Sequence, residues 1–490
     1  MERKLKKHPL LPWWPVLLIG FGGVGAAGAA ARGLSLEEAL DLVLAQSAEV
    51  RLASAGVEQA AAEQLVARSQ LYPQISATAG YTRTLKSQYS GLGNSSSEPD
   101  SGGQGAPADT SSNASFFDDL PFGQKNQYSL GLSLSQNLFA GGRLVAQKRA
   151  ANARYRSASL QLAMARAQAL LEVTRRYYDA LLAEELALIA DSSLVQAEGV
   201  LSLTETTWKE GQKSEYELLR ARVVRDNQLP LVLQRHSERD QAHLRLKELL
   251  ALALDDSLSL TTGPETPLPR FALAADTSAA RRVPVRQAQE GVAGTEALLR
   301  AARGERLPAL NFNSRYSPVA YPRSGLPGKG DFRSDWTVGL SLSLPLFTGR
   351  RLAGSEGVAR SQLVVARTRL DQARQAATLE ARVVHRDLAQ AAASLQATAT
   401  TVEQARRACG IAQLRYQEGL STQLELSDAR LLLDQALANQ ARAACNLQVA
   451  RTRLSLLSEL PLSGGGGQPA SAPASASPAG AATANSAGSF

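Results

Sequence analysis

A 17-residue segment occurs twice in this chain of 490 residues, and the duplication restricts what the chain can fold into. Residues 128–144 and 336–352 are identical at ten of 17 positions, at an offset of 208. The same offset aligns residues 208–222 with 416–430, so it spans a strand-like segment, a long helical stretch and a turn without a gap. A fixed self-similarity of this kind indicates tandem copies of one structural unit.

A second offset locates an insertion in the first copy. Residues 71–75 resemble residues 306–310 at an offset of 235, so the first copy holds 27 additional residues between this point and the repeated strand. The additional residues coincide with a Ser-, Gly- and Asp-rich stretch that reads as a flexible loop. We therefore expect a signal segment at 1–31, a first repeat at 32–265, a second repeat at 266–461 and a disordered low-complexity tail at 462–490.

The first 31 residues have the pattern of a secretory signal peptide. Residues 2–7 are basic, residues 9–31 carry no charge, and an apolar run leads into small residues that end at Ala31. A transmembrane anchor is the alternative, but Pro12 and Pro15 interrupt a short apolar core. The G-x-G-x-x-G at residues 23–28 lacks the following helix and second strand that a dinucleotide site needs.

Each copy contains two segments in which apolar and small polar residues alternate. Tyr128, Leu130 and Leu132 alternate with Ser and Gly, and Trp336 and Val338 begin the same pattern in the second copy. Period-two alternation predicts half-buried strands. The expected strand pairs lie at 74–84 and 127–138 in the first copy, and at 309–317 and 335–346 in the second.

The number of strands decides between two architectures. A β-sandwich with the apolar side inward needs about seven strands, and four are found. Four strands also cannot close a membrane barrel, which starts at about eight. Open sheet edges are not tolerated in lipid, so if these strands span a membrane, several chains must share one barrel.

Most of the remaining chain is predicted to be helical. No Pro occurs between Pro121 and Pro230 or between Pro345 and Pro461. Apolar residues recur at multiples of seven, which indicates coiled-coil-like packing; they are Leu160, Ala167, Leu181, Leu188 and Val195, with Thr174 as the exception, and Ala163, Leu170 and Tyr177 in a second seam. Each copy thus reads as a long antiparallel helical hairpin, with its tip near Gly211 or Gly419.

Composition excludes several classes of function. The first 31 residues hold four Lys or Arg and one Glu, +3 of the net +8, and the remaining +5 is spread among acids. This is a solvated surface rather than a nucleic-acid stripe, so no nucleic-acid partner is expected. No Ser/His/Asp motif, P-loop or H-E-x-x-H occurs, and the two Cys and four His are scattered. We expect no enzyme activity, catalytic residue, metal or cofactor.

These features together resemble the outer-membrane efflux protein family, the TolC-like channels. The resemblance rests on the signal segment, the tandem helix–strand–strand–hairpin units, residues 34–40 (Leu-Ser-Leu-Glu-Glu-Ala-Leu) and residues 138–143 (Leu-Phe-Ala-Gly-Gly-Arg). It implies an α+β membrane protein, with long antiparallel helical hairpins forming a periplasmic barrel. It also implies four strands per chain in a 12-stranded barrel shared by a homotrimer in outer-membrane lipid. The expected partners are a periplasmic adaptor (membrane fusion) protein and an inner-membrane pump or ABC-type exporter.

The resemblance also assigns roles to residues at the tips. Gly211, Ser214, Gly419 and Thr422 match positions that dock the adaptor. Glu217, Tyr416, Glu425 and Asp428 match positions at the periplasmic entrance, where the tyrosine can hydrogen-bond an acid on the neighbouring tip. Ser421 stands where a well-described member has a basic residue, so this chain departs from the family's gate network there.

Two classes of function follow from the sequence. One is a passive outer-membrane conduit for efflux or type I secretion, extending into the periplasm. The other is a non-channel periplasmic coiled-coil protein, structural or adaptor-like. The alternating strands favour the conduit, because an adaptor has no use for apolar stripes with terminal aromatic residues.

Overall fold

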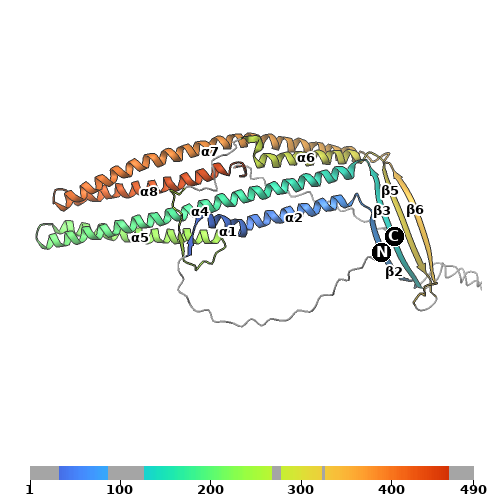
Figure 1. Cartoon of the computed structure of the whole chain (residues 1–490), viewed down its shortest axis with the longest axis horizontal. Coiled ribbons are helices and arrows are strands. Elements are labelled where there is room, and N and C mark those ends of the chain that lie inside the picture. Colours follow the sequence, from blue (N-terminus) through green and yellow to red (C-terminus); the bar gives the residue numbers. More distant parts are fainter. Residues whose placement is uncertain (1–31, 86–125, 267–277, 323–325, 463–490) are drawn as a thin grey trace, which may run out of the picture.

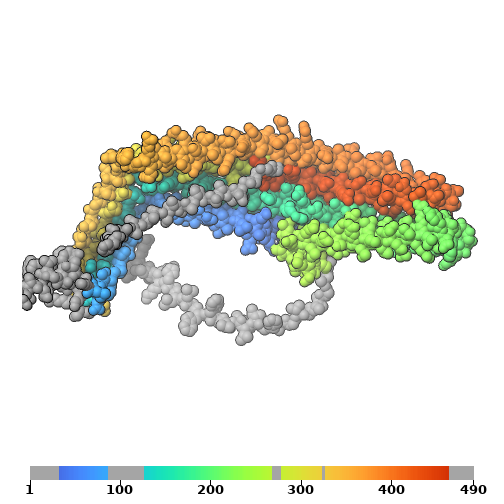
Figure 2. Space-filling model, turned by 180° about the vertical axis from the view of Figure 1, so that it is seen from behind, coloured from blue at the N-terminus to red at the C-terminus, as the bar shows by residue number. Residues whose placement is uncertain are grey.

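A computed structural model describes residues 32–85, 126–266, 278–322 and 326–462 of the chain. The expected signal peptide, the Ser- and Gly-rich loop and the C-terminal tail lie outside the described residues. The molecule is elongated, with two helical hairpins side by side and a β-sheet at the opposite end (Figure 1). Figure 2 shows from behind how the sheet turns away from the long axis of the helices.

Four helices build the two hairpins. The first pairs α4 (Arg143–Lys209) with α5 (Glu215–Leu249), and the second pairs α7 (Arg351–Gln417) with α8 (Gln423–Ser455). Both α4 and α7 have 67 residues, and their first residues are separated by the sequence offset of 208. At about 1.5 Å per residue each is on the order of 100 Å long. The duplication seen in the sequence is therefore a duplication of structure.

Shorter helices lie beside the sheet-proximal halves of α4 and α7. The helices α2 (Ala48–Ser69) and α6 (Val283–Gly304) each have 22 residues and differ by the second offset of 235. Helix α2 packs on α4, whereas α6 packs on both α4 and α7 (Figure 1). Helix α6 therefore joins the two copies.

A core at mid-length closes the base of the first hairpin. The short parallel strands β1 (Arg32–Leu34) and β4 (Leu258–Leu260) lie beside α1 (Leu36–Gln46), which begins with a capping box at Ser35. The fully buried phenol of Tyr177 donates to the carbonyl oxygen of Leu34 and accepts from the backbone N–H of Thr262. These bonds satisfy a buried hydroxyl and hold β1 and the segment after β4 against α4.

A buried ion pair holds the start of the second copy. After the short 3-10 helix η1 (Ala279–Arg281), Arg282 is fully buried and its guanidinium lies 3.0 Å from the carboxylate of Glu380 on α7. The same guanidinium donates to the carbonyl oxygens of Ala377, Leu457 and Leu460. A buried charge needs partners of this kind, and here they tie the start of α6, α7 and the segment that follows α8 together.

The sheet has four antiparallel strands in the order β2-β3-β5-β6: β2 (Gln74–Arg83), β3 (Asn126–Ala140), β5 (Ala309–Ala320) and β6 (Phe332–Ser343). The expectation that β6 runs to residue 346 was wrong. The strand ends at Ser343 because Pro345 has no N–H to donate to the ladder.

The heptad seam of α4 follows the expected path only in part. Ala167, Thr174 and Leu181 are buried, but Leu188 and Val195 are more than half exposed. From Ala180 onward the buried positions of α4 are Ala180, Leu181, Ala187, Ala190, Ser193 and Thr204. A straight helix of 3.6 residues per turn drifts by about 20° per heptad, so a strict seven-residue reading leaves the contact face after a few turns.

Candidate functional site: the helical-hairpin tips

Both tips use the same helix-ending motif. Gly211 and Gly419 have φ of 78° and 71°, and the residue after each donates a backbone hydrogen bond into the last turn of the long helix. The N–H of Gln212 donates to the carbonyl of Thr207, and that of Leu420 donates to Arg415. This is the Schellman arrangement, which requires a residue in the left-handed region. The backbone geometry of both turns therefore favours glycine at positions 211 and 419.

Each returning helix begins with a hydroxyl cap. The hydroxyl of Ser214 accepts from the N–H of Glu217, and the Glu217 carboxylate accepts from the N–H of Ser214, which completes a capping box. At the other tip the hydroxyl of Thr422 accepts from the N–H of Glu425. Helix capping therefore explains Ser214, Thr422 and Glu217 at these positions, whereas Glu425 contributes only its backbone N–H.

Tyr416 connects the two hairpins within one chain. Its side chain is buried, and its hydroxyl lies 2.9 Å from that of Thr204 on α4. The ammonium of Lys213, at the first tip, lies 5.0 Å from the centre of the Tyr416 ring and 3.4 Å from the carboxylate of Glu217. Within the described chain Lys213 therefore stands between the ring of Tyr416 and the carboxylate of Glu217.

A second link between the hairpins lies further from the tips. The hydroxyl of Ser193 on α4 donates to the carboxylate of Asp434 on α8, and Arg430 donates to Ser192. Arg430 also forms an ion pair with Asp434 at 3.3 Å. Burial raises the pKa of the Asp434 carboxyl, although the Ser193 hydroxyl and Arg430 act in the opposite direction.

Between the two links lies a cavity of about 680 Å³, lined by residues of both hairpins, among them Val200, Leu203 and Leu426. Gln423 lies on its wall with a nearly buried side chain, and neither amide atom has a hydrogen-bond partner among the described residues. Unpaired buried amides carry a free-energy cost. The tip region thus contains a cavity whose wall includes the Gln423 amide, which has no hydrogen-bond partner among the described residues.

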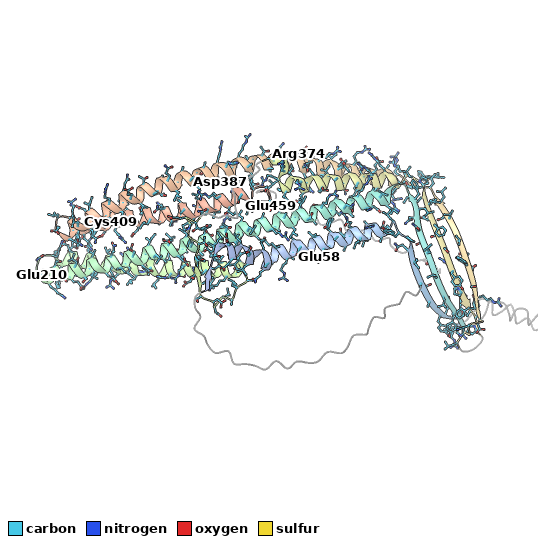
Figure 3. All side chains as sticks on the ribbon, in the orientation of Figure 1. Glu58, Glu210, Arg374, Asp387, Cys409 and Glu459 are labelled. Carbon is cyan, nitrogen blue, oxygen red and sulfur yellow. The ribbon has the colours of Figure 1, made fainter. Side chains whose placement is uncertain are left out.

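The outer surface of the tips combines acids with exposed apolar side chains. Glu425 and Asp428 are exposed on the first turns of α8. Tyr216, Leu420 and Leu424 are each more than half exposed close to the turns. In Figure 3 Glu210 marks the extreme end of the first hairpin, and Cys409 lies near the end of the second. Among the described residues no group of His, Cys, Asp and Glu could hold a metal ion.

At the far end of the molecule the sheet has one apolar and one polar face. Every β2–β3 pair joins residues of like character, as in Ala77 with Leu132 and Ser76 with Ser133. Some β5–β6 pairs do the same, as in Phe312 with Leu340, whereas others are mixed, as in Ser314 with Val338. The apolar face stays exposed: Trp336 is 72 % and Leu342 is 71 % exposed. A large exposed apolar face indicates a membrane or a partner.

Known proteins match both the hairpin end and the sheet end of the molecule. The model of the family described as outer membrane efflux protein matches residues 39–252 and 274–458, one stretch in each copy. The chain belongs to the outer membrane efflux protein family.

Members of this family and solved channels are similar over most of the chain. The pyoverdine export outer membrane protein OpmQ of Pseudomonas aeruginosa is 27% identical over 447 residues, covering 86% of this chain and 83% of OpmQ. The outer membrane protein VceC of Vibrio cholerae has a TM-score of 0.65 at 18% identity, covering 86% of this chain and 96% of VceC. The Campylobacter jejuni CmeC outer membrane channel has a TM-score of 0.67 at 17% identity, covering 91% of this chain and 94% of CmeC.

As a member of the outer membrane efflux protein family, the chain is an outer-membrane efflux channel that extends into the periplasm. Its fold is the α+β fold of TolC-like trimeric channels, with long helical hairpins and a share of a β-barrel. The exposed apolar face of the sheet is therefore its lipid-facing surface, and the hairpins are its periplasmic part.

Proposed function

We propose that three copies of this chain form one passive conduit across the outer membrane and the periplasm. One observation carries the proposal: a four-stranded sheet with an exposed apolar face, a polar face and two edges that pair with no other strand in the described part of the chain. An open edge cannot remain in lipid, and four strands cannot close a barrel. Three copies supply 12 strands, with the Ser-, Gly- and Asn-rich face toward water and the Leu-, Val- and Trp-rich face toward outer-membrane lipid.

The tips are the proposed docking surface for a periplasmic adaptor protein. Gly211, Ser214, Gly419 and Thr422 support this role because they form the two turns. A Cβ placed on either glycine would have no neighbour within 4 Å among the described residues. Another backbone can approach such a surface closely. The exposed apolar residues beside the turns offer burial to the same partner.

The proposed periplasmic entrance consists of Glu217, Tyr416, Glu425 and Asp428. Tyr416 holds the two hairpins of one chain together through Thr204, and Glu217 is linked to it through Lys213. Glu425 and Asp428 are exposed, so three copies supply six carboxylates to one ring. Rings of acids favour cations in a pore.

The division of the chain follows the duplication. Residues 1–31 are proposed to direct export, 32–265 and 266–461 to form the two repeats, and 462–490 to be a dispensable tail. The conduit is proposed to act with an inner-membrane pump or ABC-type exporter, which selects the cargo.

Fractionation of cells that produce the full chain tests the proposal. We expect a heat-modifiable trimer in the outer-membrane fraction. We also expect restored drug resistance, or restored polypeptide secretion, in a strain lacking its own channel. A soluble monomer in the periplasm would contradict the conduit and would favour the coiled-coil alternative.

A further inference from the structure

The cavity of about 680 Å³ near the tips is built by both hairpins of one chain. Its wall takes residues from all four hairpin helices, such as Leu203 of α4, Val224 of α5, Gln413 of α7 and Leu426 of α8. Figure 1 shows the two hairpins running side by side toward their tips. Ligand pockets have volumes of about 300–1,000 Å³, so this cavity can hold a whole small molecule.

Amide groups without partners border this cavity from both hairpins. Gln423 of α8 is 3% exposed, and neither its amide nitrogen nor its amide oxygen has a hydrogen-bond partner among the described residues. The buried amide oxygen of Gln228 on α5 has no partner there either. Nearly all buried polar atoms in folded proteins are paired, and an unpaired one costs free energy. Three such atoms around one cavity indicate that a bound group pairs with them.

The charges on the cavity wall favour an uncharged ligand. Among the described residues that line the cavity, Arg430 and Asp434 carry the only charges, and they form an ion pair with each other at 3.3 Å. The carboxylate of Asp434 also accepts a hydrogen bond from Ser193. A charged ligand would leave water without finding a counter-ion, at a large desolvation cost. A neutral ligand avoids this cost.

The apolar part of the wall favours an organic ligand over water alone. Val200, Leu203, Val224 and Leu426 border the cavity and offer no hydrogen bond to its contents. An ordered water molecule needs two to four polar partners, which such side chains do not provide. An apolar group that displaces water from this surface gains about 25 cal/mol per Å². The ligand that fits the wall therefore has an apolar body as well as polar groups.

We propose that this cavity is a binding site for an uncharged small molecule that combines an apolar body with carboxamide groups. A carboxamide offers both donors and an acceptor, which are the partners that an unpaired glutamine amide requires. Small capped peptides and aromatic amides have this chemistry. Five glutamine side chains stand on the wall to receive them; they are Gln196, Gln228, Gln413, Gln417 and Gln423.

A ligand in this cavity would hold the two hairpins of one chain together. The cavity lies between the bond of Tyr416 with Thr204 and the bond of Ser193 with Asp434, both of which join the hairpins. A bound molecule adds contacts to both hairpins at once, so it stabilises the arrangement in which they are packed. Binding itself does not depend on the proposed conduit, whereas any effect of the ligand on conductance does.

The first test uses the purified full chain and two capped peptides that differ only in charge. N-acetyl-phenylalanyl-leucine amide is uncharged, and the same peptide with a free carboxylate carries one negative charge. We expect isothermal titration calorimetry to show binding of the amide. The acid should bind at least about tenfold more weakly, because its charge finds no counter-ion in the cavity. Equal affinities of the two peptides would overturn the uncharged class of ligand.

Two variants locate the binding of the amide peptide. Gln423→Leu removes the unpaired amide and should weaken binding about tenfold, the effect of losing two hydrogen bonds. Its control is Gln435→Leu, at an exposed position of α8 that does not line the cavity. Equal affinities of these two variants would overturn the role of Gln423.

Gly199→Leu takes up part of the cavity with a new side chain. Gly199 borders the cavity, and a Cβ built on it would have no neighbour within 4 Å among the described residues. The side chain therefore enters open space while α4 keeps its backbone. Gly410→Leu adds the same side chain to α7, also in open space but away from the cavity wall. We expect binding to be lost in Gly199→Leu and kept in Gly410→Leu.

The outcomes separate this proposal from the proposed function. No binding of the amide peptide at millimolar concentration, or unchanged binding by Gly199→Leu, overturns the site and leaves the conduit standing. Lower single-channel conductance of the unaltered chain in the amide peptide, with no such change in Gly199→Leu, supports both the site and its hold on the two hairpins. Binding that follows the expected pattern in a chain that conducts no ions supports the site and contradicts the conduit.

Discussion

The hydroxyl of Tyr416 on α7 lies 2.9 Å from the hydroxyl of Thr204 on α4, in a buried contact between two helical hairpins. The two residues are 212 positions apart in the sequence. Thr204 also donates to the carbonyl of Val200, so its hydroxyl accepts from Tyr416. The bond fixes how far the two tips of one chain can separate.

Tyr416→Phe removes this bond and keeps the ring. We expect the contact between the two hairpins to lose about 0.5–1.5 kcal/mol, so the tips separate more easily and the single-channel conductance rises. Single-channel recording checks this. Tyr216→Phe is the control, because Tyr216 is mostly exposed at the other tip; equal conductance of the two variants would contradict a gating role for Tyr416.

Gly419→Val should abolish transport and leave trimer assembly intact. The φ of 71° costs a side chain of this kind about 1–2 kcal/mol or more, and the turn lies far from the sheet. Gly410→Val adds the same side chain within α7, where there is open space and no positive φ. The drug resistance of a strain that lacks its own channel is measured with each variant. Normal transport by Gly419→Val would show that the tip is not a docking surface.

Glu425→Gln combined with Asp428→Asn should lower cation selectivity. Three copies lose six carboxylates from one ring, whereas the cap hydrogen bond uses the backbone of Glu425 and survives. Reversal potentials in a salt gradient measure the change. Asp255→Asn with Asp256→Asn removes as much exposed charge at the base of the hairpin, and a matching shift in that control would refute a local role.

Arg282→Met should strongly weaken the start of the second copy. Breaking a buried pair leaves the Glu380 carboxylate and three carbonyl oxygens without this donor, which costs about 3–5 kcal/mol. We expect faster hydrogen exchange at the start of α6 and the end of α8. Arg286→Met, at an exposed position on α6, should leave exchange unchanged; similar protection in both variants would contradict the prediction.

Cys445 should resist alkylation in the folded protein, and no disulfide to Cys409 should form. Both cysteines are free and buried. Burial raises the pKa of the Cys445 thiol to about 12, so at pH 8 only about one molecule in 10⁴ carries the reactive thiolate. Mass spectrometry after iodoacetamide treatment measures labelling, with an exposed Gln212→Cys as the reactive control. Rapid labelling at pH 8 without denaturant would contradict the burial.

Sequence predicted the repeated elements well because each depends on local periodicity. The turns at Gly211 and Gly419, the two 67-residue helices and the alternating strands follow from patterns within a few residues of one another. The contacts between elements could not be predicted from these local patterns. The Tyr416 to Thr204 bond depends on how the two hairpins are rotated about their long axes, and the partners of Arg282 come from two separate segments, residues 377–380 and 457–460. The strands β1 and β4, of three residues each, are too short to show a period.

Because α4 and α7 have equal length, both hairpins extend the same distance into the periplasm. If one long helix gained a single turn, its tip would project about 5 Å beyond the other, and an entrance built from both tips would no longer be level. Changes in reach therefore have to occur together in α4, α5, α7 and α8. A channel adapted to a wider envelope should differ from this one by matched insertions in all four helices.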